Sequence, residues 1–253
     1  MKKLIFILTL FLIFINTVFA AGQKYTVSEY KVLTEDGFNI NATLKYPKVK
    51  GQKEFKTVVL LHSLGYNSNW WETLPDELLE QGYAIVTIDL RGHGKSVYNN
   101  KLVRQSWKNL THNAYAKYPS DVKAVISHIK KENKRIFFDN WALVGSDIGA
   151  GAGICAISSL DSKPKTIVML SPVVNAKGIY VPVKMAELSG VDIFAISGTG
   201  DLASINAQEY LSKFAQNTFT TYISPSRSNG QLLLKNDASL SKVITAWISQ
   251  YLE

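Results

Sequence analysis

The 253-residue chain contains a single cysteine, Cys155. One thiol excludes an internal disulfide framework and a four-cysteine zinc site. Glycine and proline, at sixteen and seven residues, are not enriched, which excludes a collagen-like or low-complexity chain. Histidine is scarce as well, because only four are present and none follows His128. With 46% hydrophobic residues the chain can still bury a sizeable core, so disorder is excluded as its main state.

The first twenty residues are predicted to be an export signal. Lys2 and Lys3 form a basic start, residues 4–15 are apolar, and the segment ends in a small residue, Ala20. We predict cleavage after Ala20, which leaves a single domain over residues 21–253, secreted or held in the periplasm or cell envelope. An uncleaved anchor is the alternative, because the apolar stretch is almost long enough to span a bilayer. After cleavage no stable membrane span is expected.

The charge balance says little about function. The formal net charge is +8, and it falls to +6 when the predicted signal takes away Lys2 and Lys3. No basic stripe interleaved with aromatic residues and no nucleic-acid motif accompanies this mild excess. We therefore expect no nucleic-acid partner.

Short apolar runs alternate with helix-like stretches along the rest of the chain. Such runs are typical of parallel strands that are buried on both faces. The predicted strands cover residues 57–61, 83–88, 141–144, 166–170, 192–196 and 219–223, after a hairpin at 25–33 and 38–46. The predicted helices cover residues 70–81, 120–131, 148–160, 204–216 and 239–252. This alternation predicts an α/β fold: a doubly wound, mostly parallel sheet of about eight strands, led by an antiparallel hairpin, with helices on both faces.

The loops that follow three of these strands carry recognisable motifs. They read His-Ser-Leu-Gly at 62–65, Arg-Gly-His-Gly at 91–94 and Gly-Ser-Asp-Ile-Gly at 145–149. Together and in this order they resemble the α/β-hydrolase superfamily, particularly its small esterases and acyl hydrolases. The resemblance implies that fold, no cofactor, no metal, and a minimal cap, because only about twenty residues separate the strands on either side of residues 171–190.

The nucleophile elbow of this family is a tight turn flanked by small residues. Taking Gly145 and Gly149 as the flanking glycines places Asp147 at the nucleophile position. Taking Ser146 instead would put bulky β-branched residues at the flanks, which the turn does not tolerate. Relatives such as haloalkane dehalogenases and epoxide hydrolases do use an Asp there, and a helix N-terminus favours the carboxylate.

The other catalytic positions are inferred from the same resemblance. The family places its acid after the penultimate strand, where Asp201 lies, and its histidine after the last strand, where Asn229 lies. An amide cannot accept a proton near neutral pH. The oxyanion hole is made of backbone N–H groups, and the resemblance assigns them to Ile148 and to Ser63 or Leu64.

Two functions stay open. The first is an exported pseudoenzyme, descended from a serine esterase or acyl hydrolase, that binds a small ester- or acyl-type ligand or an envelope partner through the remaining pocket. The second is an active hydrolase of ester or acyl bonds with a non-standard site centred on Asp147.

Overall fold

The computed structural model describes residues 24–252. The predicted export signal, residues 1–20, lies outside the described residues. Within them, no helix is long and apolar enough to cross a membrane.

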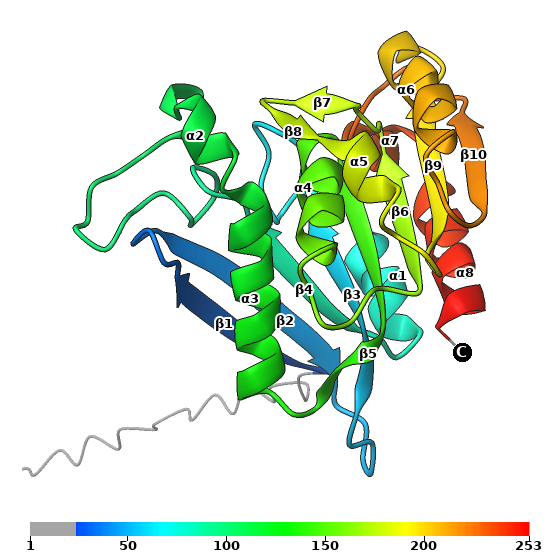
Figure 1. Ribbon diagram of the computed structural model, residues 1–253. Helices are drawn as coiled ribbons and strands as arrows, with labels where there is room; N and C mark the ends of the chain where they lie inside the picture. The colour runs from blue at the N-terminus through cyan, green and yellow to red at the C-terminus, as the bar shows by residue number, and fades with distance from the viewer. Residues whose placement is uncertain (1–23, 253) are drawn as a thin grey trace, which may run out of the picture.

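Eight strands form one sheet in the order β1-β2-β4-β3-β5-β6-β9-β10 (Figure 1). β1 and β2 form an antiparallel hairpin, β2 pairs antiparallel with β4, and the remaining neighbours are parallel. The strands are β1 (Tyr25–Leu33), β2 (Asn39–Pro47), β3 (Phe55–Leu61), β4 (Ala84–Asp89), β5 (Ile136–Ser146), β6 (Thr166–Leu170), β9 (Asp192–Gly198) and β10 (Phe219–Ser224). The predicted α/β-hydrolase sheet with its leading hairpin is confirmed.

Helices cover both faces of this sheet. Helices α3 and α4 lie on one face, and α1 and α8 lie on the other (Figure 1). The helices are α1 (Leu74–Glu80), α2 (His112–Tyr115), α3 (Tyr118–Glu132), α4 (Ile148–Ile157), α5 (Val181–Met185), α6 (Leu202–Ser212), α7 (Leu232–Asn236) and α8 (Leu240–Tyr251), with a 3₁₀ turn at Trp107–Asn109. A small hairpin of β7 (Asn175–Ala176) and β8 (Ile179–Tyr180) precedes α5. The β7–β8 hairpin and α5 together form the minimal cap between β6 and β9.

Helix α1 is shorter than the helix predicted over residues 70–81. It begins at Leu74, because Glu72 has a φ of 48° that a right-handed helix cannot contain. Pro75 follows in the first turn, where its missing N–H breaks no helical hydrogen bond. Trp71 is buried in the core beside α1, whereas Trp70 is 41% exposed.

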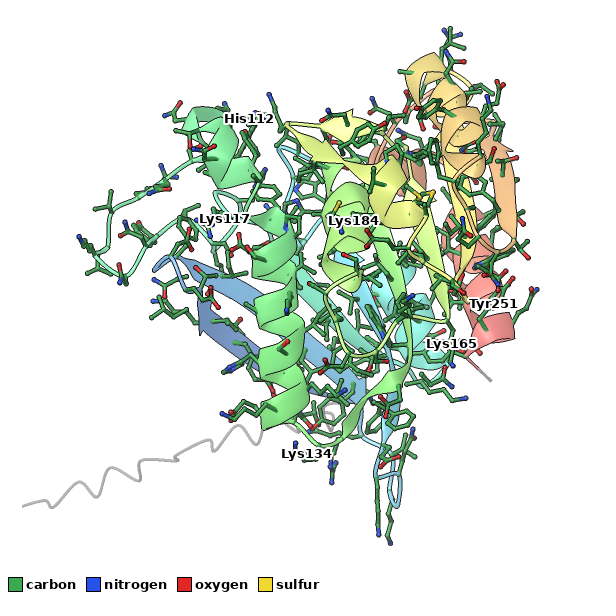
Figure 2. The ribbon with its side chains drawn as sticks, viewed as in Figure 1. His112, Lys117, Lys134, Lys165, Lys184 and Tyr251 are labelled. Atoms are coloured by element: carbon green, nitrogen blue, oxygen red, sulfur yellow. The ribbon has the colours of Figure 1, made fainter. Side chains whose placement is uncertain are left out.

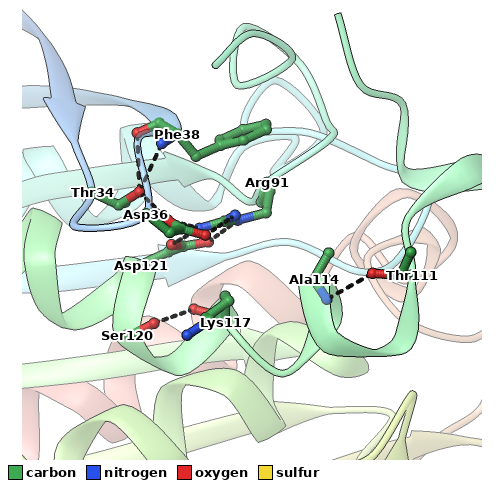
Figure 3. Close-up of polar contacts among 9 residues, drawn as sticks. All are labelled: Thr34, Asp36, Phe38, Arg91, Thr111, Ala114, Lys117, Ser120 and Asp121. Carbon is green, nitrogen blue, oxygen red and sulfur yellow. Dashed lines mark hydrogen bonds and ion pairs between the residues drawn. The ribbon is translucent and has the colours of Figure 1, made fainter. Parts of the chain in front are cut away.

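Arg91 ties the leading hairpin to α3 (Figure 3). Its guanidinium donates two hydrogen bonds to Asp36, of 2.6 and 2.8 Å, and two to Asp121, of 2.9 and 2.7 Å. It also lies 4.5 Å from the centroid of the Phe38 ring. The hydrogen bonds from Arg91 lower the pKa of Asp36 to about 2. Burial opposes the charged guanidinium, but its two carboxylate partners raise the pKa of Arg91 above its ordinary value.

Replacing Arg91 with methionine tests this link. Arg91→Met leaves the buried Asp121 carboxylate without its partner, so we expect the free energy of unfolding to fall by about 3–5 kcal/mol. Urea unfolding at neutral pH measures the change. Lys95→Met is the matched control, because it removes an ion pair with Glu29 in which both side chains are exposed, and no measurable change is expected. Equal losses in the two variants would contradict this assignment.

Candidate active site

The turn between β5 and α4 has the backbone of a nucleophile elbow. Its tip is Asp147, with a φ of 51° and a ψ of −122°, a region that residues other than glycine rarely adopt. The glycines on either side are required by close packing. A Cβ on Gly145 would overlap the backbone of Ala150, and one on Gly149 would overlap the carbonyl oxygen of Leu61. The structure therefore places Asp147 at the tip and uses both glycines as its flanks.

Ser146 does not face the cleft. Its side chain is fully buried, and its hydroxyl lies 2.6 Å from the Ser63 hydroxyl. A Cβ on Gly230 would lie 3.2 Å from the Ser146 hydroxyl oxygen, so this face of the turn is covered. Ser146 is thus in no position to attack a ligand.

The Asp147 carboxylate lies against the backbone donors of the predicted oxyanion hole. Its Oδ2 accepts a hydrogen bond of 3.3 Å from the N–H of Leu64, and the adjacent N–H of Ile148 favours the charged form of the carboxylate. Burial raises the pKa of Asp147 and the nearby Asp201 carboxylate adds to the rise, while these two N–H groups oppose it. Asp147 therefore occupies the position that a developing oxyanion would need.

Ser63 was the alternative to Leu64 as a donor. The structure turns the Ser63 N–H away from Asp147, because it donates a hydrogen bond of 3.0 Å to Oε1 of Gln231. Gln231 is buried, and its Nε2 makes no hydrogen bond within the described residues. This glutamine joins the loop after β10 to the turn after β3. The sequence does not indicate this contact, because a glutamine two positions after Asn229 matches no motif.

Two of the four histidines hold this turn in place. His62 Nε2 accepts the N–H of Leu90 at 2.9 Å, and His93 Nε2 accepts the N–H of Gly65 at 3.0 Å. A ring nitrogen accepts a hydrogen bond only when it is unprotonated. Burial lowers the pKa of His62 to about 3 and that of His93 to about 4, so both rings are neutral at physiological pH. They support the backbone and do not enter the cleft.

The other two histidines lie elsewhere. His112 is on α2, at the end of the molecule where the β7–β8 hairpin lies (Figure 2), and its ring packs against Gly178 in that hairpin. His128 on α3 meets Tyr30 edge-on, with ring centroids 5.8 Å apart. Neither lines the cleft that contains Asp147. The cleft therefore holds no imidazole that could act as a base.

Asp201 and Asn229 both line the same cleft as Asp147. Asp201 is the N-cap of α6, where its Oδ1 accepts the N–H of Ser204 at 3.2 Å. Asn229 is exposed on the loop after β10, next to Gly230, whose N–H donates to the Ser171 hydroxyl at 2.7 Å. The structure thus brings together in one cleft the three residues that the resemblance assigns to the catalytic positions, two carboxylates and an amide.

The cleft has a volume of about 840 Å³ and is large enough for a small organic ligand. Among the described residues that line it, the only charged side chains are Asp147 and Asp201, and none is a cation that would attract a carboxylate or phosphate. The rest of its lining mixes small apolar, aromatic and neutral polar side chains: Leu64, Tyr66, Val173, Val174, Ala203, Ala207 and Tyr210, with Ser63, Ser171, Asn175, Ser204, Asn206, Asn229 and Gly230. Among the described residues, no group of three or more His, Cys, Asp or Glu is arranged to hold a metal ion.

Comparison with known proteins agrees with this geometry. Residues 52–218 match the family model described as serine aminopeptidase, S33. A fission-yeast (Schizosaccharomyces pombe) protein named as a probable lipase is 28% identical over 171 residues, which cover 62% of this chain and 36% of that protein. The chain therefore matches only about a third of the length of that curated relative.

Several solved esterases share the fold. An esterase from Exiguobacterium antarcticum superposes with a TM-score of 0.64 at 14% identity, covering 88% of this chain and all of the other. An esterase from Pyrococcus furiosus gives 0.66 at 15% identity, covering 90% and 92%. A dienelactone hydrolase from Anabaena variabilis gives 0.63 at 15% identity, covering 90% and 99%. At these identities the likeness concerns the fold alone.

The strained turn predicts that glycine at position 147 stabilises the protein. Asp147→Gly removes a non-glycine residue from this backbone region and a half-buried carboxylate, and these gains outweigh the greater conformational entropy that glycine gives the unfolded chain. We expect a gain of about 1 kcal/mol in the free energy of unfolding. Chemical denaturation measures it. Asp147→Asn is the control, because it removes the charge and still places a non-glycine residue in the strained backbone conformation. A glycine variant no more stable than the asparagine variant would contradict backbone strain at this site.

The neutral histidines predict a pH dependence of stability. The pKa of His93 is about 4 in the folded protein against 6.5 for the free side chain, so the unfolded chain binds the extra proton. Stability from this group is complete above pH 6.5 and is lost as the pH falls toward 4, by about 3 kcal/mol. In His93→Gln a non-titrating acceptor can bond Gly65, so its free energy of unfolding should fall less over this range. Parallel curves for wild type and His93→Gln would contradict the assignment.

Proposed function

The chain belongs to the S33 serine aminopeptidase family of α/β hydrolases, and from that premise we propose that it is an exported pseudoenzyme of esterase or acyl-hydrolase descent. In this proposal it binds a small ester- or acyl-type ligand in the cleft at Asp147 without cleaving it. The observation that carries the proposal is the Asp147 carboxylate at the elbow tip, bonded to the backbone N–H of Leu64.

Electrostatics supports the loss of acyl transfer. In an esterase, backbone donors stabilise negative charge that develops on the substrate oxygen in the transition state. Here the N–H of Leu64 already donates a hydrogen bond to a carboxylate, and the adjacent N–H of Ile148 favours the charged form of the same carboxylate. An oxyanion entering the same place would have to displace this carboxylate and would be repelled by it. The barrier would rise even if another nucleophile were supplied.

The proton chemistry supports the same conclusion. Acyl transfer needs a base to accept the nucleophile's proton and return it to the leaving group. The family position for that base holds Asn229, and the four histidines of the chain lie outside the cleft. Asp201 would then have no imidazole to orient, and its hydrogen bond to the Ser204 N–H gives it a structural role as the N-cap of α6.

The cleft itself persists, which supports ligand binding over a purely structural role. It combines small apolar side chains with two tyrosines, and such a lining suits the organic body of an ester or amide. An envelope protein that inserts a side chain into the cleft is the other partner compatible with this lining. Export is supported by the basic, apolar and small-residue segments of residues 1–20.

An active hydrolase is the second candidate. It is favoured by the elbow, which presents Asp147 as it would a nucleophile. The Asp147 carboxylate could attack the alkyl carbon of a substrate ester, so that the alkyl C–O bond breaks, the substrate's carboxylate leaves and an alkyl-enzyme ester forms. Hydrolysis of that ester would still need an activated water, and Asp201 is the one other acid of the cleft. This candidate requires that activity depend on the Asp147 carboxylate.

Reversion of two residues tests the proposal. We expect wild-type protein to show no turnover of short p-nitrophenyl esters above that of Asp147→Asn. The double variant Asp147→Ser/Asn229→His restores a nucleophile, a base and free oxyanion donors, and should raise the rate at least about a hundred-fold. A fluorophosphonate probe should label the double variant and not the wild type.

Three controls make the outcome specific. Asp147→Ser alone lacks the base and should stay near the wild-type rate, and Ser146→Ala should leave both the wild type and the double variant unchanged. Wild-type turnover that disappears in Asp147→Asn would overturn the pseudoenzyme and establish the active hydrolase. A ligand-binding role is contradicted if esters and their non-hydrolysable amide analogues fail to shift the melting temperature of the wild type.

A further inference from the structure

A protruding loop outside the cleft combines exposed apolar residues with positive charge. We refer to residues 98–104 as the tip loop, because its ends are joined by a β-bridge between Tyr98 and Arg104. Leu102 is 74% exposed and Val103 is 53% exposed, and Tyr98 at the base is 42% exposed. Two adjacent aliphatic side chains are therefore held in solvent with no protein surface covering them.

The tip loop is ordered by its own hydrogen bonds. The side-chain oxygen of Asn99 accepts the N–H groups of Lys101 and Val103, at 3.0 and 2.9 Å. Leu102 between them has a φ of 60°, an unfavourable value for leucine that the turn imposes. Such a fixed turn presents its apolar tip without the entropy loss of ordering a flexible segment on binding.

The charge around the tip loop is predominantly positive. Residues 90–120 contain no aspartate or glutamate. Arg91 and Lys95 in this stretch have acidic partners, but Lys101, Arg104, Lys108 and Lys117 are exposed and form no ion pair within the part of the chain that the structure describes. The hairpin turn that contacts the loop contributes two exposed acids, Glu35 and Asp36, and Asp36 is already paired with Arg91, so the local excess remains positive.

We propose that the tip loop docks on an anionic phospholipid membrane. Leu102 and Val103 would enter the boundary between headgroups and acyl chains, while Lys101 and Arg104 would lie among the anionic headgroups. Interfacial binding combines the burial of apolar side chains with the attraction of flanking cations to anionic lipids. Neither contribution alone gives stable attachment. The exposed Val183 and Leu202 lack this excess of positive charge, because the lysine that follows Val183, Lys184, is paired with Glu187, and Leu202 directly follows Asp201.

The geometry connects this docking surface to the cleft. Trp107, three residues after the tip loop, stacks on His93 with ring centroids 5.6 Å apart and planes 6° from parallel. His93 in turn accepts the N–H of Gly65, and Trp107 lies against the same glycine. The loop is therefore anchored on the turn that carries Leu64, so docking would hold the cleft at a fixed place relative to the membrane.

A fluorescent reporter at the tip tests the proposal. The environment-sensitive dye NBD is attached to Leu102→Cys in the exported chain, with Cys155→Ser to remove the half-buried native thiol. With vesicles that contain phosphatidylglycerol in phosphatidylcholine, we expect a blue shift and a several-fold rise in emission. With phosphatidylcholine alone we expect neither. Ile223→Cys is the matched control: Ile223 is 40% exposed on β10, at the opposite edge of the sheet from the hairpin that contacts the tip loop, and its label should not respond. This local readout reports the tip whether or not residues 1–20 are retained.

Charge removal supplies the second arm. The apparent affinity for the mixed vesicles should fall about five-fold for each of Lys101→Ser and Arg104→Ser, and high salt should weaken it further. A label at position 102 that does not respond, or an equal response at position 223, would overturn the proposal. Salt-sensitive adsorption without a response at position 102 would also overturn it, because it would indicate a purely electrostatic attraction to anionic polymers.

Discussion

The close approach of α4 to the sheet is the constraint on which the rest of the site depends. Gly149 lies so near the Leu61 carbonyl, and Gly145 so near Ala150, that a Cβ at either position would overlap backbone. With both neighbours fixed, residue 147 has to take up the strained backbone between them. Its side chain then faces the first N–H of α4 and the N–H of Leu64. A hydroxyl in this place would be an exposed nucleophile. The carboxylate in this place instead accepts the hydrogen bond that an oxyanion would need.

The backbone therefore gives the site its shape, whereas the side chains of Asp147 and Asn229 determine its reactivity. The elbow, the turn after β3 and the cleft are all built as in an α/β hydrolase. The histidines show the same separation, because His62 and His93 lie beside the site but are committed as neutral acceptors to Leu90 and Gly65. Their presence preserves the shape of the turn and supplies no proton acceptor to the cleft. Shape and reactivity can thus diverge without a change of fold.

Buried strands and the glycine pattern could be predicted from the sequence, and contacts between loops could not. Residues 166–170 form β6 as predicted, because a short apolar run buried on both faces leaves little freedom. Strand β5 starts at Ile136, earlier than the predicted start at Trp141. The apolar pattern did not indicate this earlier part of the strand, because polar residues interrupt the run and the pairing with β3 is irregular there. Pairing of Gln231 with Ser63, 168 positions apart, depends on how two loops meet, which no local pattern encodes. The spacing of Gly145 and Gly149 did predict which residue occupies the elbow tip.

Helix α4 also bears on how the protein folds. It contains glycine at positions 149, 151 and 153, and each costs about 1 kcal/mol of intrinsic helix stability relative to alanine. Its first glycine faces β3, its last faces Leu143 of β5, and Gly151 lies beneath Val181 of α5. The segment is too weak a helix former to fold alone, so its helical state comes from these contacts. We therefore expect α4 to form only after β3 and β5 have paired, which makes the turn that carries Asp147 a late product of folding and not part of its nucleus.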